Sequence, residues 1–527
     1  MKVLIITLFL FAALSISAQN DKASYKKLDK ALKLIESQYV DTIDAEKLAT
    51  AAVQAMIKEL DPHSKYLSAE TLKSNNETLN GSFAGVGIHY QILNDTMIVL
   101  NVVPGGPAQM AGIIAGDKLL EVDGISTVGK ELSNSFLSAK LRGPKGTKPN
   151  LKVLRHADKS IQTIEITRDN ISINTLSVNY MISKTTGFIR ITNFSRNTNL
   201  EFQMAVMQLQ SEGMKNLIVD LRGNPGGLMI ASINMADAFL EDGKLIVYTE
   251  GAHSARTEYK ATAGGALEKG KVVVLIDGNS ASASEIFAGA IQDWDRGIIM
   301  GRRSFGKGLV GRNYTLPDGS AIRITTGRYY TPSGRCIQKS YQEGNEKYKQ
   351  DRYRRFENGE IYNADSIHFD DSLKYYTDGK RLVYGGGAIM PDIFIPMDTS
   401  FNSPYLNLIN RYGFINYYTG IYFDKNLEML QNQFPTFRQF NAGFIMTDEM
   451  FDDMNALAFD KHKIKGSSED ILISKEVIKT SFKAYLARNL YENGSYYQVT
   501  NQIDQMVVQA LETINRNKLF KAKGIHE

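Results

Sequence analysis

Residues 271–294, KVVVLIDGNSASASEIFAGAIQDW, decide the fold of the largest domain. Five apolar residues, 272–276, precede a turn rich in Gly and Ser, and a helical pattern follows over 285–294. A continuous apolar strand of this kind is typical of a sheet that is buried on both faces. The sequence therefore predicts a layered α/β core in which a helix begins where a buried strand ends.

The same unit occurs once more upstream. The apolar run 217–221 is followed by RGNPGG at 222–227 and by a helical pattern over 228–240. Junctions of this type direct backbone N–H groups and the positive end of a helix toward one point. We place this core at residues 171–398, with a polar insertion at about 339–380. Because acidic residues in the insertion nearly cancel its Lys and Arg, we expect a solvated segment there and no nucleic-acid partner.

Length and composition limit the remaining possibilities. A chain of 527 residues is expected to form three or four domains. A net charge of +4 gives no argument for binding nucleic acid or an anionic membrane surface. Cys336 is the single cysteine, which excludes an intrachain disulfide and a cysteine-based zinc site. The seven His residues are scattered, so we expect no metal and no cofactor.

The N-terminus has the layout of a secretory signal peptide. Lys2 precedes an apolar run at 3–14, and small residues precede Gln19. We predict a signal peptide at residues 1–18, cleaved after Ala18, and an exported protein of the periplasm or cell envelope. If the segment is not cleaved, it would tether the chain to the membrane.

The other regions differ in their patterns. Apolar residues at helical spacing predict a helical hairpin over 19–80, and short strands with Gly and Pro turns predict a separate unit over 81–170. Residues 399–527 read as a mostly helical, aromatic-rich extension. The chain as a whole is therefore predicted to be a multi-domain α/β (α+β) protein.

Two motifs suggest chemistry that the surrounding sequence opposes. Residues 301–308, GRRSFGKG, match a phosphate-binding loop up to Gly308, which replaces the Ser or Thr that binds Mg²⁺. A strand-like run follows where a helix is required, so we expect no nucleotide. Ser304 and Lys307 form an S-x-x-K pattern, but the SDN and KTG motifs that accompany it in penicillin-recognising enzymes are absent from the sequence.

A third pair of residues is better placed for hydrolysis. Ser282 lies where a strand meets a helix, so its hydroxyl can be presented at the helix N-terminus. No G-x-S-x-G motif surrounds it, which gives little support to a Ser-His-Asp enzyme. Lys307, between two glycines, can act as the base if its amine is neutral. On spacing alone, Ser282 as a helix cap and Lys307 as a surface residue are equally good interpretations.

Residues 81–170 resemble a PDZ domain. The segment Gly85-Val86-Gly87-Ile88 matches the carboxylate-binding loop of that family, and GDKLLEVDG at 116–124 supports the resemblance. Free N–H groups at such a turn can hold a peptide C-terminus, while the neighbouring strand edge accepts an extended peptide.

Several further motifs occur together in one order: LDPHS at 60–64, DLRGNPGG at 220–227, SASASEI at 280–286, FGKG at 305–308 and YTPSG at 330–334. With the PDZ-like unit, they resemble the C-terminal processing peptidases, also called tail-specific proteases. The resemblance implies a serine endopeptidase with a ClpP/crotonase-like core that acts on proteins or peptides with free C-termini. By position it implies Ser282 as the nucleophile and Lys307 as the general base. It also implies an oxyanion hole formed by the N–H groups of Gly226 or Gly227 and of Ala283.

One position departs from the family pattern. A Gln that orients the lysine is usual four residues after it, where this chain has Gly311. The rival hypothesis is therefore a pseudoprotease that binds C-termini or serves as a scaffold in the cell envelope. Homo-oligomer formation and an envelope adaptor are further partners that the sequence leaves open.

Overall fold

A computed structural model describes residues 23, 25–129, 132–368, 370–516 and 520–521. The predicted signal peptide, 1–18, lies outside these residues. The chain divides into two compact units, of which the smaller comprises Met1–Leu72, Gly311–Thr326 and Tyr341–Tyr348. Within the part that the structure describes, no helix has both the length and the apolar character needed to cross a membrane.

The smaller unit combines N-terminal helices with a strand. Residues 25–38 are helical, and α2 (Ala45–Lys58) follows with Asp44 as its N-cap. The predicted hairpin is interrupted before α3 (Ala69–Asn80) by β1 (Lys65–Leu67), which pairs with β18 (Ala321–Tyr330). Asp61 fixes the turn before β1 by accepting hydrogen bonds from Ser64 and Thr325. Pattern reasoning missed this strand because its partner lies about 260 residues away in the sequence.

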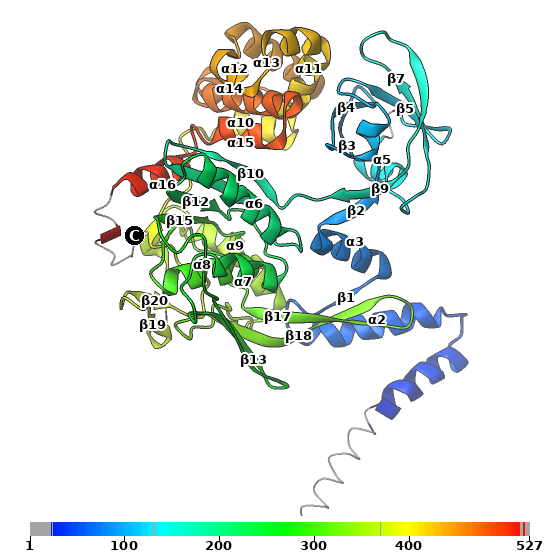
Figure 1. The fold of residues 1–527 in the computed structure, drawn as a ribbon. Helices are drawn as coiled ribbons and strands as arrows, with labels where there is room; N and C mark the ends of the chain where they lie inside the picture. The colour runs from blue at the N-terminus through cyan, green and yellow to red at the C-terminus, as the bar shows by residue number, and fades with distance from the viewer. Residues whose placement is uncertain (1–22, 24, 130–131, 369, 517–519, 522–527) are drawn as a thin grey trace, which may run out of the picture. The chain divides into compact units, whose positions relative to one another are not determined.

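Residues 82–172 form the compact strand-rich unit that the glycine-punctuated pattern predicts (Figure 1). Its main sheet has the order β3-β4-β5-β7-β8, while β2 pairs with β9. The elements are β2 (Ser82–Gly85), β3 (Ile88–Leu93), β4 (Thr96–Val102), α4 (Pro107–Met110), β5 (Lys118–Val122), β6 (Ile125–Ser126), α5 (Asn134–Leu141), β7 (Asn150–Leu154), β8 (Ile161–Glu165) and β9 (Asp169–Ser172). Because β3 is at one end of the order, its outer edge has no neighbouring strand among the described residues.

The core contains a six-stranded sheet that is covered on both faces, as the apolar strands predict. Its order is β10 (Leu176–Met181), β11 (Thr186–Ile191), β12 (Asn216–Asp220), β15 (Val272–Ile276), β16 (Ile298–Gly301) and β21 (Ile393–Phe394). All neighbours are parallel except β10 and β11. Helices α6 (Thr198–Ser211), α7 (Met229–Asp237) and α8 (Ala283–Asp293) cover one face. Helix α16 (Gln505–Asn515) covers the other.

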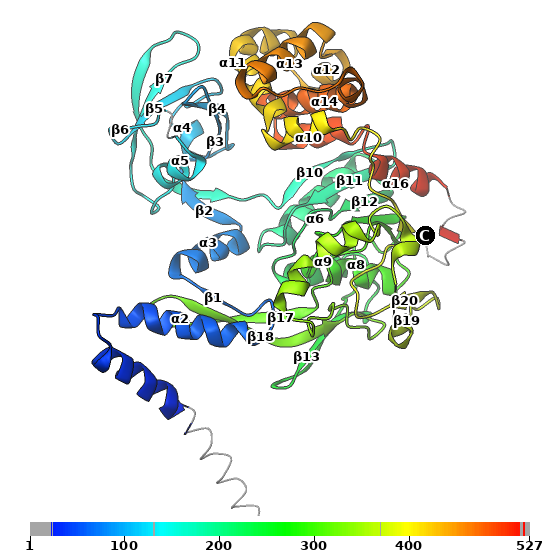
Figure 2. The ribbon, with the colours of Figure 1, turned by 180° about the vertical axis from the view of Figure 1, so that it is seen from behind.

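The polar insertion is partly buried, so the prediction of a solvated segment is wrong for several of its residues. It contains α9 (Asn345–Glu357) and β19 (Lys374–Tyr376), and β19 pairs with β20 (Leu382–Tyr384), which follows the insertion (Figure 2). Lys339, Arg355 and Glu360 are each less than one tenth exposed. They form ion pairs with Asp351 and Arg303, and this pairing explains how a charged segment can be buried.

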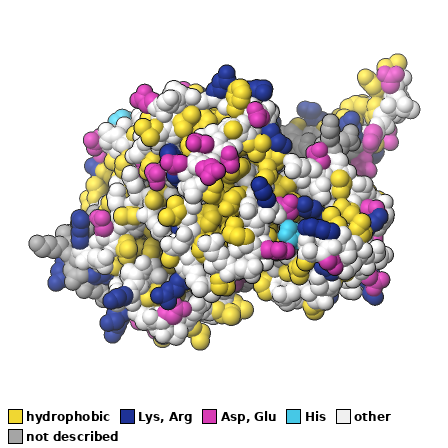
Figure 3. All heavy atoms as spheres, turned by 90° about the horizontal axis from the view of Figure 1, so that it is seen from above, with side chains coloured by type: hydrophobic (Ala, Val, Ile, Leu, Met, Phe, Trp, Pro, Cys, Tyr) yellow, Lys and Arg dark blue, Asp and Glu magenta, His cyan; other side chains and the backbone are white. Residues whose placement is uncertain are grey.

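The C-terminal extension is helical, as predicted. It contains α10 (Pro404–Arg411), α11 (Phe414–Gln433), α12 (Phe437–Gly443), α13 (Asp448–His462), α14 (Ser468–Leu490) and α15 (Asn493–Thr500), which share one aromatic-rich core. Helix α16 is different, because its buried residues pack with the core sheet. In Figure 3, acidic and basic side chains are interspersed on the face shown, in keeping with the small net charge.

We predict that Ala510→Asp destabilises the core by about 3 kcal/mol. Ala510 is fully buried on α16 against the sheet, so the carboxylate would be desolvated there. The control is Val508→Asp on the same helix, where the side chain is 39% exposed. Thermal unfolding followed by circular dichroism measures the difference, and equal melting temperatures for the two variants would contradict the packing described for α16.

Candidate active site

Ser282 occupies the strained junction between β15 and α8. It is the N-cap residue of α8, and its backbone has φ 57° and ψ −114°, a conformation that residues other than Gly rarely adopt. The preceding loop is fixed by Ser280, which donates to the carbonyl of Leu221 at 2.8 Å and accepts from the N–H of Asp277 at 2.9 Å. The hydroxyl-bearing residue is therefore held at the positive end of a helix by a rigid turn.

The glycine pair after β12 lies against Ser282. A Cβ placed on Gly226 would be 2.8 Å from the Cβ of Ser282, and one on Gly227 would be 2.0 Å from the carbonyl oxygen of Phe194. Both glycines also have positive φ, +96° and +146°. No other residue fits at either position without moving backbone, so the loop approaches Ser282 as closely as the chain allows.

Two backbone N–H groups beside Ser282 have no protein acceptor among the described residues: those of Gly227 and Ala283. The N–H of Gly226 differs, because it donates to Oδ1 of Asn224 at 2.9 Å. The carbonyl of Asn224 in turn accepts from the N–H of Ala281 at 3.0 Å, which ties the glycine loop to the serine loop. Unpaired N–H groups at such a position can receive developing negative charge on a substrate oxygen.

A buried carboxylate, that of Glu285, joins Ser282 to Lys307. Oε2 accepts from the backbone N–H of Ser282 at 2.8 Å and of Lys307 at 2.9 Å. Oε1 accepts from the N–H of Gly306 at 2.7 Å and from the hydroxyl of Ser304 at 2.5 Å. Glu285 is 1% exposed. The loop that carries Lys307 is therefore bound to the first turn of the helix that begins after Ser282.

Burial raises the pKa of Glu285, and the hydrogen bonds from Ser304, Lys307, Gly306 and Ser282 oppose that rise only in part. All four donors point at carboxylate oxygens, so the ionised form fits the site. A proton on either oxygen would face a donor that is already in place.

Tyr329 joins the same two residues on their carbonyl side. Its hydroxyl lies within hydrogen-bonding distance of two backbone carbonyls, that of Ser282 at 3.1 Å and that of Lys307, and these two acceptors share its one proton. The side chain is 1% exposed and comes from β18. With Glu285 on the amide side and Tyr329 on the carbonyl side, the backbones of Ser282 and Lys307 are held in a fixed relation.

The segment before Lys307 is supported by the insertion. Arg355 donates to the carbonyls of Ser304 at 2.6 Å and Phe305 at 3.3 Å. Lys339 contributes its N–H to the carbonyl of Gly306 at 3.0 Å, and its amine lies 4.0 Å from the centroid of the Phe305 ring. These charged residues are buried because they hold a backbone segment that has no regular secondary structure.

The structure thus brings together Ser282, Gly226, Gly227 and Ala283, and it connects them with the backbone of Lys307 through Glu285 and Tyr329. Gly85, Val86, Gly87 and Ile88 are elsewhere, at the junction of β2 and β3. Gly311 lies in β17 (Leu309–Thr315), where a Cβ would be 3.3 Å from Cγ of Arg323. Among the described residues no group of three His, Cys, Asp or Glu could hold a metal ion.

Sequence reasoning missed two residues of the site. Glu285 stands three positions after Ser282, in the third position of a helix, which is a recognised signal for a bond to the cap residue. That signal predicts its contact with Ser282 but not those with Gly306 and Lys307. Tyr329 directly precedes the YTPSG motif, and no local pattern identifies its partners.

Comparisons with protein families match four segments of the chain. Peptidase family S41 matches residues 185–346, and a PDZ domain matches residues 98–155. The N-terminal domain of the activating protease CtpB matches residues 12–71, and a family of unknown function matches residues 405–492.

Individual relatives agree with these matches. A carboxy-terminal-processing protease of Bartonella bacilliformis is 36% identical over 333 residues, which cover 62% of this chain and 76% of the relative. A probable CtpA-like serine protease of Staphylococcus aureus is 35% identical over 341 residues, which cover 64% of this chain and 67% of the relative. A solved photosystem II D1 C-terminal processing protease is 29% identical, with 59% of this chain and 89% of that chain covered and a TM-score of 0.34.

We predict that Glu285→Gln lowers kcat for peptide cleavage at least about 100-fold. The amide has one acceptor oxygen in place of two, and its NH₂ group would face backbone N–H donors that now bind the carboxylate. The matched control is Glu258→Gln, an exposed acid in β14 (Ser254–Lys260). Activity within threefold of the parent in Glu285→Gln would contradict the bridging role.

We predict that Tyr329→Phe lowers kcat about fivefold, the equivalent of one buried hydrogen bond of about 1 kcal/mol. The ring stays in place, whereas the donor to the carbonyls of Ser282 and Lys307 is lost. Tyr330→Phe is the control, since Tyr330 stacks on Tyr248 with ring centroids 4.7 Å apart. The comparison is a steady-state assay, and equal kcat for both variants would show that the hydroxyl does not position the site.

Proposed function

The chain belongs to the C-terminal processing proteases of peptidase family S41, and from this premise we propose that Ser282 is the nucleophile and Lys307 the general base. The observation that carries this proposal is the carboxylate of Glu285, which binds the backbone of both residues. A nucleophile and its base must keep a fixed geometry, and this bridge supplies one.

The reaction follows from these positions. The neutral amine of Lys307 accepts the proton of the Ser282 hydroxyl while the serine oxygen attacks the peptide carbonyl. The tetrahedral intermediate collapses as the protonated amine returns its proton to the leaving amino group. Water then attacks the acyl-enzyme, and Lys307 accepts a proton from that water. The second tetrahedral intermediate then breaks its bond to Oγ of Ser282, and the protonated amine of Lys307 returns its proton to that oxygen as the carboxylic acid product leaves.

The oxyanion of this intermediate is assigned to two N–H groups. Gly227 and Ala283 have N–H groups that donate to no protein acceptor among the described residues, whereas that of Gly226 is already bound to Asn224. Of the two glycines that the family resemblance offers, the proposal therefore selects Gly227. The role of Gly226 is steric, because any side chain at this position would collide with Ser282.

Substrate tails are assigned to the PDZ domain. The free carboxylate would bind at Gly85–Ile88, and the extended tail would add to the open edge of β3. Ile88, Tyr90 and Ile92 alternate along β3 and, like Phe136 of α5, are partly buried against the domain's apolar core. This lining favours tails that end in apolar residues.

Two further parts of the proposal rest on sequence alone. Export to the periplasm or cell envelope depends on the signal peptide at residues 1–18, and a ClpP/crotonase-like core depends on the family resemblance. The alternative function, a pseudoprotease that binds C-termini, is favoured by Gly311. A homo-oligomer or an envelope adaptor is proposed as a further partner under either function.

We predict that Ser282→Ala lowers cleavage at least about 1,000-fold and leaves tail binding unchanged. The substrate is a loosely folded protein with an apolar free C-terminus, and the same protein with an amidated tail is run beside it. The proposal expects cleavage by the parent alone, with a higher KM for the amidated tail. Cleavage by Ser282→Ala would refute the nucleophile assignment, and equal KM for the two tails would refute the role of the PDZ domain.

Failure of the parent to cleave, with the tail still bound, would favour the pseudoprotease. The variant Gly311→Gln then restores the side chain that relatives use beside the lysine. Activity gained by this variant would show a dormant dyad, while continued inactivity would leave a binding protein.

A further inference from the structure

Asp504 is the residue just before α16, and its carboxylate binds both the first turn of that helix and Arg222 of the core. Within its own segment it is the N-cap, since Oδ1 accepts from the N–H groups of Met506 at 3.0 Å and Val507 at 3.2 Å. Toward the core, its two carboxylate oxygens accept from Nη1 of Arg222 at 3.0 and 2.8 Å. Asp504 lies outside the segments that match peptidase family S41 and the C-terminal family of unknown function.

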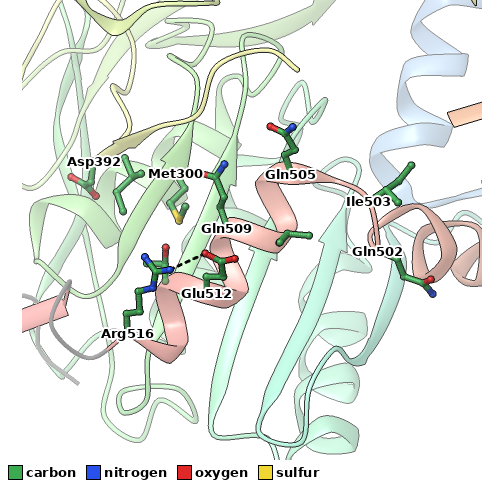
Figure 4. Close-up of a pocket in the computed structure, with 11 residues that line it drawn as sticks. Met300, Asp392, Gln502, Ile503, Gln505, Gln509, Glu512 and Arg516 are labelled. Carbon is green, nitrogen blue, oxygen red and sulfur yellow. Dashed lines mark hydrogen bonds and ion pairs between the residues drawn. The ribbon is translucent and has the colours of Figure 1, made fainter. Parts of the chain in front are cut away.

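Helix α16, which carries this contact at its N-terminus, is packed against the core sheet. Met506, Val507, Ala510 and Ile514 are buried against the core sheet. Gln505 and Glu512 are exposed residues of the helix; Figure 4 shows them around a pocket that Met300 and Asp392 of the core also line, and Glu512 pairs with Arg516. The N-cap is therefore fixed by packing on one side of α16, independently of the exposed residues on the other.

Arg222 is the first residue of the glycine loop and belongs to a balanced cluster of charges. Asp220, which is fully buried, accepts from Nε of Arg222 at 2.9 Å, from its Nη2 at 2.8 Å, and from Arg190. Arg190 also donates to the carbonyl of Arg222 at 2.9 Å. The two arginines thus share the carboxylate of Asp220, and Asp504 supplies a second carboxylate to Arg222.

The charge cluster is connected to the proposed oxyanion donors through the glycine loop, which begins at Arg222 and contains Gly227. Four residues separate Arg222 from Gly227, and one of them, Gly223, donates its N–H to Asp277 at 3.0 Å. Asp277 belongs to the loop that carries Ser282 and also accepts from the N–H of Asn279 at 2.9 Å. Any shift of Arg222 is therefore passed to both loops that meet at Ser282.

We propose that Asp504 is a positioning residue of the peptidase: it holds Arg222, and through it the glycine loop that presents the N–H of Gly227. The proposal rests on the oxyanion role assigned to Gly227 above. Without the Asp504 charge, Arg222 would be left with the carboxylate of Asp220, which it already shares with Arg190. The side chain of Arg222 is 14% exposed, so water cannot fully replace the lost partner.

The test is Asp504→Asn. Asn is as good an N-cap as Asp, so α16 is kept while the charge on Arg222 is lost. We expect kcat to fall about tenfold with KM within twofold, because a small displacement of an oxyanion donor affects the transition state and not the tail. Affinity for a peptide aldehyde, which forms a tetrahedral adduct with serine, should fall by the same factor. Affinity for the corresponding peptide alcohol should not change.

The matched control is Glu512→Gln, which breaks the pair with Arg516 on the same helix and leaves Arg222 untouched. Its kcat and aldehyde affinity should equal those of the parent. Wild-type kcat and aldehyde affinity in Asp504→Asn would overturn the proposal. Equal losses for aldehyde and alcohol, or failure of Asp504→Asn to fold, would also overturn it, because Asp504 would then serve stability alone. Loss of activity in Ser282→Ala tests the proposed nucleophile separately, so the two assignments can fail independently.

Discussion

The buried carboxylate of Glu285 is the constraint on which the site depends. Taking an ionised carboxylate out of water costs several kcal/mol unless donors replace the lost water. Here four donors do so, three from backbone N–H groups and one from the hydroxyl of Ser304. The donors lie in the segments that carry Ser282 and Lys307, so neither segment can move without leaving a buried charge unsatisfied. The backbone of Lys307 is thus placed relative to that of Ser282 because both donate hydrogen bonds to the buried Glu285 carboxylate.

Much of the remaining architecture serves this arrangement. The six-stranded sheet is covered on both faces. Its neighbouring strands β12 and β15 are parallel and therefore end at the same edge, where the glycine and serine loops meet. The polar insertion supplies Arg355 to the loop before Lys307, and the C-terminal helix supplies Asp504 to the glycine loop. Segments outside the peptidase core are therefore part of the support of its active site. These contacts explain why charged residues are buried in regions whose polar composition predicts exposure to solvent.

The sequence predicted what local pattern and motif can carry: the two strand–loop–helix units, the PDZ-like strands, the helical extension, and the clustering of Ser282 with Gly226 and Gly227. It did not predict contacts between residues far apart in the chain. β1 pairs with β18 across about 260 positions, and Asp504 meets Arg222 across 282. Burial of the insertion was also missed, because its net charge says nothing about which charges are paired. Hydrophobic periodicity shows which face of a helix or strand is buried, but it does not show which other element packs against that face.

The central claim is that Ser282 and Lys307 act as a pair whose geometry Glu285 fixes. A crystal structure of the protein with a tail peptide aldehyde tests it most directly. The account predicts a covalent bond to Oγ of Ser282, the adduct oxygen within hydrogen-bonding distance of the N–H groups of Gly227 and Ala283, and the Lys307 amine within hydrogen-bonding distance of Oγ. An adduct on another residue, or a Lys307 amine directed away from Ser282 while Glu285 keeps its four bonds, would contradict it.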